Sequence, residues 1–105
     1  PAVPGSAEAV KQAGKAGKVK VIGLGLPNEN KRYVHEGVTD TVMLWNTEEL
    51  GALAVQAAVA TAKGQLKAGD KSFKPGAKGY EIQGDSILLG KPFKFDQSNI
   101  DQFDF

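Results

Sequence analysis

The sequence predicts an α/β protein built on parallel strands, with a β-hairpin appendage toward its C-terminal end. Two short apolar runs, residues 18–25 and 38–44, are each followed by a segment with helical spacing. Gly and Pro then become frequent after residue 66, and only short alternating runs follow. Because strands and helices alternate with short connections, we expect parallel strands joined by right-handed crossovers.

The N-terminal part of the chain is predicted to hold two helices and two strands. Ser6 is a suitable N-cap for the first helix, and the glycines Gly14 and Gly17 end it. The first apolar run becomes fully apolar toward its end, which is typical of a central strand. The expected elements are a turn-rich entry at residues 1–6, a helix from Ser6, a strand at 18–25, a helix at 28–36 that stops at Gly37, and a strand at 38–44.

Residues 41–51 contain the clearest boundary in the sequence, where an apolar strand gives way to a long helix. Asn46 is a good N-cap, and Glu49 has the spacing of a capping box, so the helix is predicted to begin at Thr47 and to end near Gly64. Ligands of open α/β sheets bind beyond the carboxyl ends of such strands. The predicted buried stripe of the helix consists of Leu50, Leu53, Ala54, Ala57 and Thr61, widened by Val55 and Val59.

The C-terminal part of the chain has a different character. Residues 67–79 are predicted to be a loop, and Gly84-Asp85 is a two-residue hairpin signal between strands at 80–83 and 86–89. A third strand of this antiparallel appendage is expected at residues 92–95. Residues 99–105 are too apolar for a free tail, so we expect them to dock on the main body.

Composition limits the function more than it defines it. The 105 residues suffice for one domain, and the net charge of +1 is spread along the chain, which argues against a nucleic-acid partner. There is no cysteine, so disulfides and thiolate zinc sites are excluded. No apolar run is long enough to span a bilayer. Since the chain begins at Pro1 and its predicted core is thin, we expect a processed product or a fragment whose missing part lies upstream.

No pattern of residues predicts catalysis, a cofactor or a metal. Gly23 and Gly25 resemble part of the dinucleotide fingerprint, but its third glycine is absent and Pro27 occupies the turn. These glycines are better explained by the end of a strand and its turn. His35, the only histidine, has no second ligand at helical spacing and is predicted to lie on the surface. We therefore expect that the protein is not an enzyme.

Trp45 and Asn46 are the candidate binding residues that the residue pattern itself supplies. An indole and an amide at the carboxyl end of a parallel strand offer a stacking face and a group that both donates and accepts hydrogen bonds. A polyhydroxylated ligand uses this combination. The alternative is structural, with Trp45 packed in a core or an interface and Asn46 serving only as the helix cap.

Several segments together resemble the C-terminal part of periplasmic sugar-binding proteins of ABC importers. They are residues 22–28, 44–46, 49–51 and 88–90 and the ending Asn-Ile-Asp-Gln-Phe-Asp-Phe at 99–105. The resemblance covers nearly the whole chain, and its nearest group is the rhamnose-binding and autoinducer-2-binding branch. It implies a type I periplasmic binding protein, in which two Rossmann-like parallel-sheet lobes face each other across a cleft. Residues 1–66 then correspond to part of the second lobe, and residues 67–105 to a loop, the hairpin and the docked tail.

The resemblance also implies binding residues and partners. Autoinducer-2 binders place a proline and the second following residue against the ligand, which corresponds here to Pro4 and Ser6, while Trp45 and Asn46 fall near a ligand contact of the same lobe. Ser6 replaces an alanine, and Gly25 replaces the aspartate of the wider ribose-binding family, so the ligand is expected to differ from ribose.

The implied ligand is a small sugar or sugar-like signal. The other implied partners are an ABC permease in the inner membrane and the remainder of the same protein or a second copy, and the implied location is the periplasm. The alternatives are the effector domain of a sugar-responsive transcription regulator and an NAD-type enzyme, which Pro27 argues against.

Overall fold

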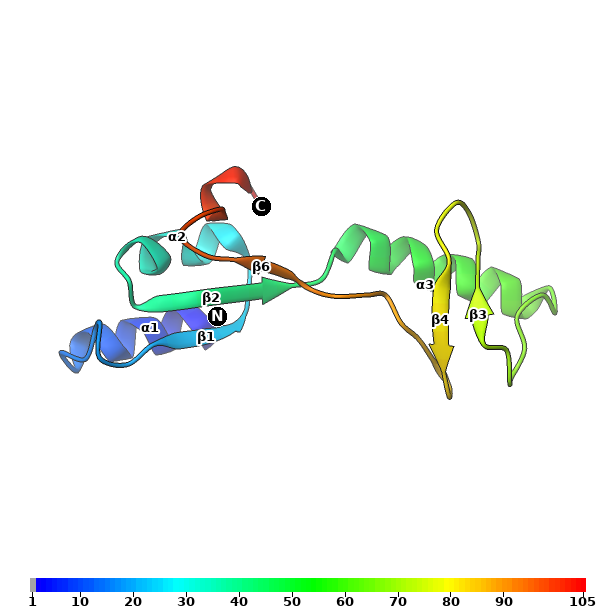
Figure 1. Ribbon diagram of the computed structural model, residues 1–105, viewed down its shortest axis with the longest axis horizontal. Helices are drawn as coiled ribbons and strands as arrows, with labels where there is room; N and C mark the ends of the chain where they lie inside the picture. The colour runs from blue at the N-terminus through cyan, green and yellow to red at the C-terminus, as the bar shows by residue number, and fades with distance from the viewer. Residues whose placement is uncertain (1) are drawn as a thin grey trace. The chain divides into compact units, whose positions relative to one another are not determined.

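The computed structural model describes residues 2–105, which form two compact units (Figure 1). Unit 1 comprises the described residues up to Leu44 together with Pro92–Phe105, and unit 2 comprises Trp45–Lys91. The chain therefore leaves unit 1 after Leu44 and returns to it at Pro92. These limits differ from the predicted segments 1–66 and 67–105. The assignment of residues 1–66 to one lobe of a two-lobe protein stays a prediction.

Unit 1 is an α/β unit on a three-stranded sheet in the order β1-β2-β6. Strands β1 and β2 are parallel, as predicted, and β6 is antiparallel to β2. Among the described residues β1 pairs only with β2, so the prediction of a central strand at 18–25 is wrong and β2 is central instead. The elements of the unit are α1 (Ala2–Gln12), β1 (Val21–Leu24), α2 (Pro27–His35), β2 (Thr39–Leu44), β6 (Phe93–Phe95) and the 3₁₀ helix η1 (Ile100–Gln102).

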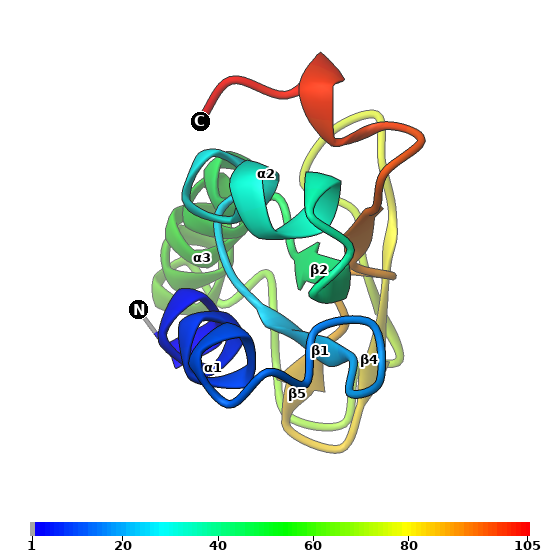
Figure 2. The same ribbon diagram turned by 90° about the vertical axis from the view of Figure 1, so that its left-hand side faces the viewer.

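Helices α1 and α2 cover the same face of this sheet (Figure 2). Gly23 of β1 and Val42 of β2 are register partners in a parallel pair, so their side-chain positions share a face. Val3 of α1 approaches Gly23, and Val34 of α2 packs with Val42. By alternation, Ile22 and Leu24 project from the opposite face, where they are 64% and 57% exposed. One side of the sheet is therefore covered, and two large apolar side chains of β1 are uncovered on the other.

The C-terminal tail docks on unit 1, as predicted. Ile100 is fully buried and belongs to the core cluster that also contains Val34, Val42 and Phe95. The ring of Phe103 packs edge-on against that of Phe95 with centroids 4.7 Å apart. The tail therefore contributes to the core of the unit.

The first helix begins earlier than predicted. α1 already includes Pro4 and Ser6, so the expected turn-rich entry up to residue 6 is wrong, and Ser6 is not an N-cap. Proline is tolerated in the first turn of a helix, where its missing N–H has no intrahelical partner. Pro4 therefore does not prevent the helix from starting near residue 2.

Unit 2 combines α3 (Thr47–Ala62) with a three-stranded antiparallel sheet of β3 (Ser72–Phe73), β4 (Tyr80–Gln83) and β5 (Ser86–Ile87). The predicted hairpin is confirmed, since Gln83 pairs with Ser86 across a two-residue turn in which Gly84 has φ +58°. Two details of the prediction are wrong. Strand β3 lies within the predicted loop 67–79, and strand β6 pairs with β2 in unit 1 rather than extending the hairpin.

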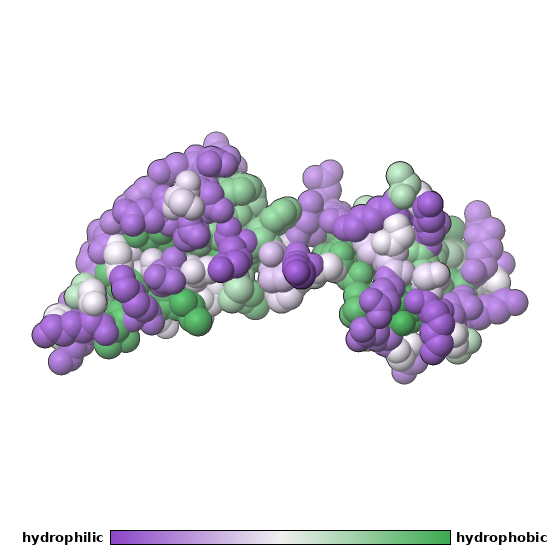
Figure 3. Space-filling model, in the orientation of Figure 1, coloured by the Kyte–Doolittle hydropathy of each residue, from purple (hydrophilic) through white to green (hydrophobic). Residues whose placement is uncertain are grey.

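The predicted buried stripe of α3 is largely wrong. Leu53 and Ala60 are the buried residues of this helix, whereas Leu50, Val55 and Val59 are 49%, 65% and 47% exposed. Hydrophobic surface is visible among the polar side chains of unit 2 (Figure 3). A helix that is apolar on most of its circumference is typical of one buried on several sides. Within unit 2, α3 is covered on one side.

Candidate ligand-binding site

The turn from β1 into α2 lies at the carboxyl edge of the parallel strands and is held from inside by Asn30. The fully buried Asn30 donates from Nδ2 to the Leu26 carbonyl at 2.8 Å, and the Gly25 N–H donates to the Met43 carbonyl at 3.1 Å. A Cβ atom on residue 25 would lie 2.8 Å from Asn30 Nδ2. Glycine is therefore required at position 25 as long as Asn30 fills this space.

The two glycines of the partial dinucleotide pattern have separate structural roles. Gly23 lies inside β1 rather than in a turn, and a Cβ atom there would lie 2.5 Å from Cγ2 of Val3. Its role is thus the close approach of α1, which corrects the predicted role in ending the strand. Pro27 occupies the first position of α2 and supplies no N–H, while the Asn28 N–H donates to the backbone oxygen of Phe105 at 3.1 Å. At the first two positions of α2, the amides that would bind a pyrophosphate are therefore absent or engaged.

Pro4 lines an open pocket of about 500 Å³ together with Glu29, Arg32 and Tyr33. Pro4 is half-buried on α1, and the other three side chains come from α2. The pocket combines an apolar ring, a phenol, a guanidinium and a carboxylate. Such a set of groups suits a polar ligand with several hydroxyls.

Glu8 organises the charged side of this pocket. Its Oε2 accepts hydrogen bonds from Arg32 Nη2 at 2.9 Å and from the Tyr33 hydroxyl at 3.0 Å, and the Arg32 guanidinium lies 4.7 Å from the centre of the Tyr33 ring. The hydrogen bond from Tyr33 lowers the pKa of Glu8, and the same bond raises the pKa of Tyr33. Sequence reasoning missed Glu8, Arg32 and Tyr33, because they come from two helices and share no local motif.

Ser6 lies two residues after Pro4 on α1 and is exposed. Helical positions two apart point in different directions, so the side chains of Pro4 and Ser6 do not share a helix face. Ser6 is not among the residues that line the Pro4 pocket. Its role in ligand binding stays a prediction.

Asn46 caps α3 as predicted. Its Oδ1 accepts a hydrogen bond from the Glu49 N–H at 3.0 Å, which satisfies one of the free donors of the first turn. The amide Nδ2 takes no part in this cap. The capping role of Asn46 is therefore confirmed, and a ligand role for Nδ2 stays a prediction.

Trp45 uses its ring nitrogen within unit 2. The indole Nε1 donates to the Gly90 carbonyl at 3.1 Å, and the residue is 38% exposed. The hydrogen bond fixes the ring and leaves part of its surface accessible. A stacking contact by the ring stays a prediction, but the N–H is already engaged.

Glu49 does not complete the predicted capping box with its side chain. Its Oε1 instead accepts hydrogen bonds from the Tyr80 hydroxyl at 2.9 Å and from Lys78. Lys78 lowers the pKa of Glu49 and Glu49 raises that of Lys78, while burial and this hydrogen bond raise the pKa of Tyr80. The three side chains tie the start of α3 to the hairpin. Their separation of about 30 positions hid this cluster from sequence reasoning.

The four predicted binding residues are divided between the units. Pro4 and Ser6 lie on α1 in unit 1, whereas Trp45 and Asn46 begin unit 2. Of the four, Pro4 is the one that lines the pocket formed with Arg32 and Tyr33. His35 is exposed, as predicted, and its Nε2 lies 2.8 Å from Asp101 Oδ1.

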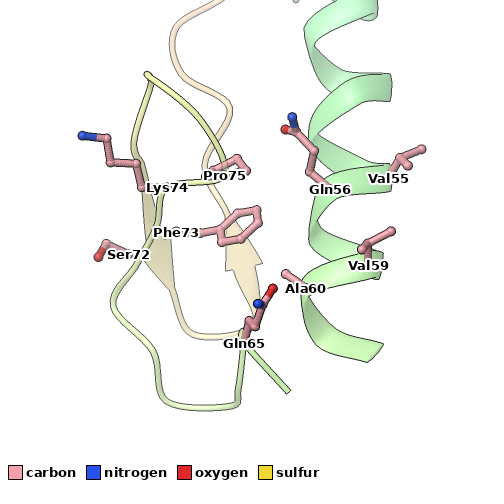
Figure 4. Close-up of a pocket in the computed structure, with 9 residues that line it drawn as sticks. All are labelled: Val55, Gln56, Val59, Ala60, Gln65, Ser72, Phe73, Lys74 and Pro75. Carbon is pink, nitrogen blue, oxygen red and sulfur yellow. The ribbon is translucent and has the colours of Figure 1, made fainter. Parts of the chain in front are cut away.

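Unit 2 has a larger pocket between α3 and β3, of about 630 Å³ (Figure 4). The ring of Phe73 points toward α3, and Val55 and Val59 project from the other side of the helix. Its polar lining consists of Gln56, Gln65, Ser72 and Lys74, without a buried charged group. Among residues 2–105, no three His, Asp or Glu side chains are grouped as a metal site, and no helix is long and apolar enough to cross a membrane.

A comparison with protein families decides the affiliation of the chain. Residues 1–66 match the model of the periplasmic binding protein domain. The chain belongs to the periplasmic binding protein domain family. The α/β architecture with a parallel β1–β2 pair is that of the type I members of this family, so the predicted fold class and the family resemblance are confirmed.

Three solved structures match nearly all of the chain. A sugar ABC transporter protein from Actinomyces odontolyticus is 31% identical, with a TM-score of 0.73 over 98% of this chain and 34% of its own. LsrB from Clostridium saccharobutylicum in complex with AI-2 is 28% identical, with a TM-score of 0.77, and the match covers 99% of this chain and 37% of LsrB. An ABC transporter solute-binding protein from Clostridium phytofermentas with bound L-rhamnose is 32% identical, with a TM-score of 0.74, and the match covers 95% of this chain and 36% of that protein. The chain thus spans about a third of the length of the proteins it matches.

Proposed function

We propose that this chain is part of the solute-binding component of an ABC importer, which captures a small sugar resembling rhamnose, or autoinducer-2, in a cleft between two lobes. The observation that carries the proposal is the match of nearly the whole chain to sugar-transport proteins, two of which hold L-rhamnose or AI-2. No observation favours the alternative of a sugar-responsive transcription regulator.

The exposed apolar surfaces support the view that more of the fold completes this chain. Ile22 and Leu24 leave one face of the sheet uncovered, and β1 has an unpaired edge among the described residues. Leu50, Val55 and Val59 leave α3 similarly exposed in unit 2. The matched structures are about three times as long as this chain, which is enough to supply the missing cover.

The ligand contacts that we propose are taken for each unit by itself: the Pro4 pocket and Ser6 in unit 1, and the exposed groups of Trp45 and Asn46 in unit 2. Arg32 adds guanidinium N–H donors next to Pro4, while the O–H of Tyr33 already donates to Glu8. In this function the protein does no chemistry on the ligand and needs no cofactor. Its partners are the ligand and an inner-membrane permease, and its location is the periplasm, as for the family.

Calorimetry on the two-lobe protein that carries this sequence tests the proposal. L-rhamnose and autoinducer-2 are titrated in parallel, and ribose serves as the comparison sugar because Gly25 replaces the aspartate of ribose binders. We expect saturable binding of one of the first two ligands and much weaker binding of ribose. The absence of binding by both would refute the proposed ligand class.

A further inference from the structure

Residues 101–105, here called the C-terminal strap, lie along α2 and contact both of its ends. At the last residue of the helix, His35 Nε2 lies 2.8 Å from Asp101 Oδ1. At its first turn, Asn28 Nδ2 donates to Asp104 Oδ1 at 3.0 Å, and the Asn28 N–H donates to the backbone oxygen of Phe105 at 3.1 Å. Between these contacts, Phe103 packs on Phe95 in the core. The strap is therefore anchored at both ends of the helix and, between them, on the core of unit 1.

The strap supplies what the sequence of α2 lacks. The N-cap residue is Leu26, which makes no side-chain capping bond, and Pro27 at the first position has no N–H. The backbone oxygen of Phe105 takes the place of a cap for the Asn28 N–H. The Asp104 carboxylate lies at the positive end of the helix dipole, where a negative charge is favourable.

The position of this helix end matters because it follows the carboxyl edge of the sheet. The turn before α2 is held from inside by the bond of Asn30 to the Leu26 carbonyl. The strap holds the same turn from outside, through Asn28. Pro4, Arg32 and Tyr33 line the neighbouring pocket, and the last two belong to α2. A shift of α2 therefore moves groups of the proposed ligand site.

We propose that the C-terminal strap fixes α2 and its preceding turn, which makes Asn28 and Asp104 positioning residues for a ligand bound beside α2. The capping of the helix by the strap stands on the contacts alone, and its effect on ligand binding rests on the proposed function. Both residues are exposed, so their exchange leaves the core intact.

Exchanging the amide and the carboxylate of the hydrogen-bonded pair Asn28 and Asp104 tests the strap in the 105-residue chain. Asn28→Asp sets two carboxylates against each other, and the double variant Asn28→Asp with Asp104→Asn restores one amide and one carboxylate. The readout is the hydrogen-exchange protection factor of amide 28 measured by NMR. We expect a loss of about tenfold or more in Asn28→Asp and a return to within about threefold of the original in the double variant.

Two controls accompany this measurement. Asp85→Asn makes the same chemical change as Asp104→Asn, but in the hairpin turn of unit 2, and is expected to leave amide 28 unaffected. The amides of Val34 and Val42 report whether the core of unit 1 stays folded. Any of three results would overturn the proposed role of the strap. They are an unprotected amide 28 in the unaltered chain, no loss of its protection in Asn28→Asp, and no recovery of that protection in the double variant.

The effect on the ligand is measured on the two-lobe protein with L-rhamnose as the probe. We expect affinity to fall about tenfold in Asn28→Asp and to recover in the double variant. Unchanged affinity in Asn28→Asp would overturn the positioning role even if the strap were confirmed. A lack of rhamnose binding by the unaltered protein counts against the proposed function and leaves the exchange result decisive for the strap.

Discussion

Replacement of Gly23 by alanine tests how closely α1 lies against the sheet. The new Cβ atom would lie 2.5 Å from Cγ2 of Val3, a separation that real Cβ atoms essentially never show. Val3 is only 7% exposed and has little freedom to move away. Either the valine leaves its rotamer or α1 shifts, so we expect Gly23→Ala to destabilise unit 1 by about 1–3 kcal/mol.

A second substitution, Val3→Ala, tests the destabilisation expected for Gly23→Ala. Val3→Ala removes two methyl groups from a buried site and alone costs about 1.5–2.5 kcal/mol. In the double variant the methyl group of residue 23 occupies the space that Val3 vacates. We therefore expect the double variant to be no less stable than Val3→Ala, with a favourable coupling energy of about 1–3 kcal/mol.

Urea unfolding of the four chains, followed by circular dichroism, measures this coupling. Gly51→Ala is the matched control, since Gly51 lies within α3 with no atom within 4 Å of an added Cβ. This control is expected to stabilise its helix by about 0.5–1 kcal/mol. If Gly23→Ala behaves like Gly51→Ala, or if the two substitutions in unit 1 are simply additive, the reasoning about close approach is refuted.

Four further predictions concern pH, the cap and assembly. Because the pKa values of Glu8 and Glu49 are lowered on folding, these residues contribute stability above pH 4.5, and it is lost as the pH falls through their folded-state pKa values. Because the pKa of Lys78 is raised on folding, this residue contributes stability below pH 10.5, and it is lost as the pH rises through its folded-state pKa. Thermal melts from pH 2 to 12 should thus show a melting temperature that is constant near neutral pH and falls at both extremes. Glu8→Gln and Glu49→Gln should make the fall on the acidic side smaller. Asn46→Ser should keep the cap and weaken ligand affinity of the two-lobe protein by about 1–3 kcal/mol, as measured by calorimetry and by Trp45 emission; wild-type affinity with unchanged emission would leave both residues in structural roles. The isolated chain should self-associate through its exposed apolar surfaces, which sedimentation of a stable monomer would contradict. Micromolar monosaccharide binding by the isolated chain in calorimetry would contradict the two-lobe account.

The sequence determined the local features of this protein. The cap at Asn46, the turn at Gly84-Asp85 and the docking of the apolar tail followed from residues close together in the chain, and all three are present. The type and order of the larger helices and strands also followed, because hydrophobic periodicity and capping act within a few residues. The resemblance carried by residues 22–28, 44–46 and 99–105 gave the family.

Tertiary structure decided which elements share a core and which side chains meet. Strand β6 joined β2 rather than the hairpin, and β1 became an edge strand, since pairing between distant strands depends on the whole fold. The Glu8–Arg32–Tyr33 and Glu49–Lys78–Tyr80 clusters join residues 24 to 31 positions apart. No local propensity encodes such contacts. Gly23 shows the same limit, because the sequence marks a glycine there but only the packing of α1 explains why a side chain is excluded.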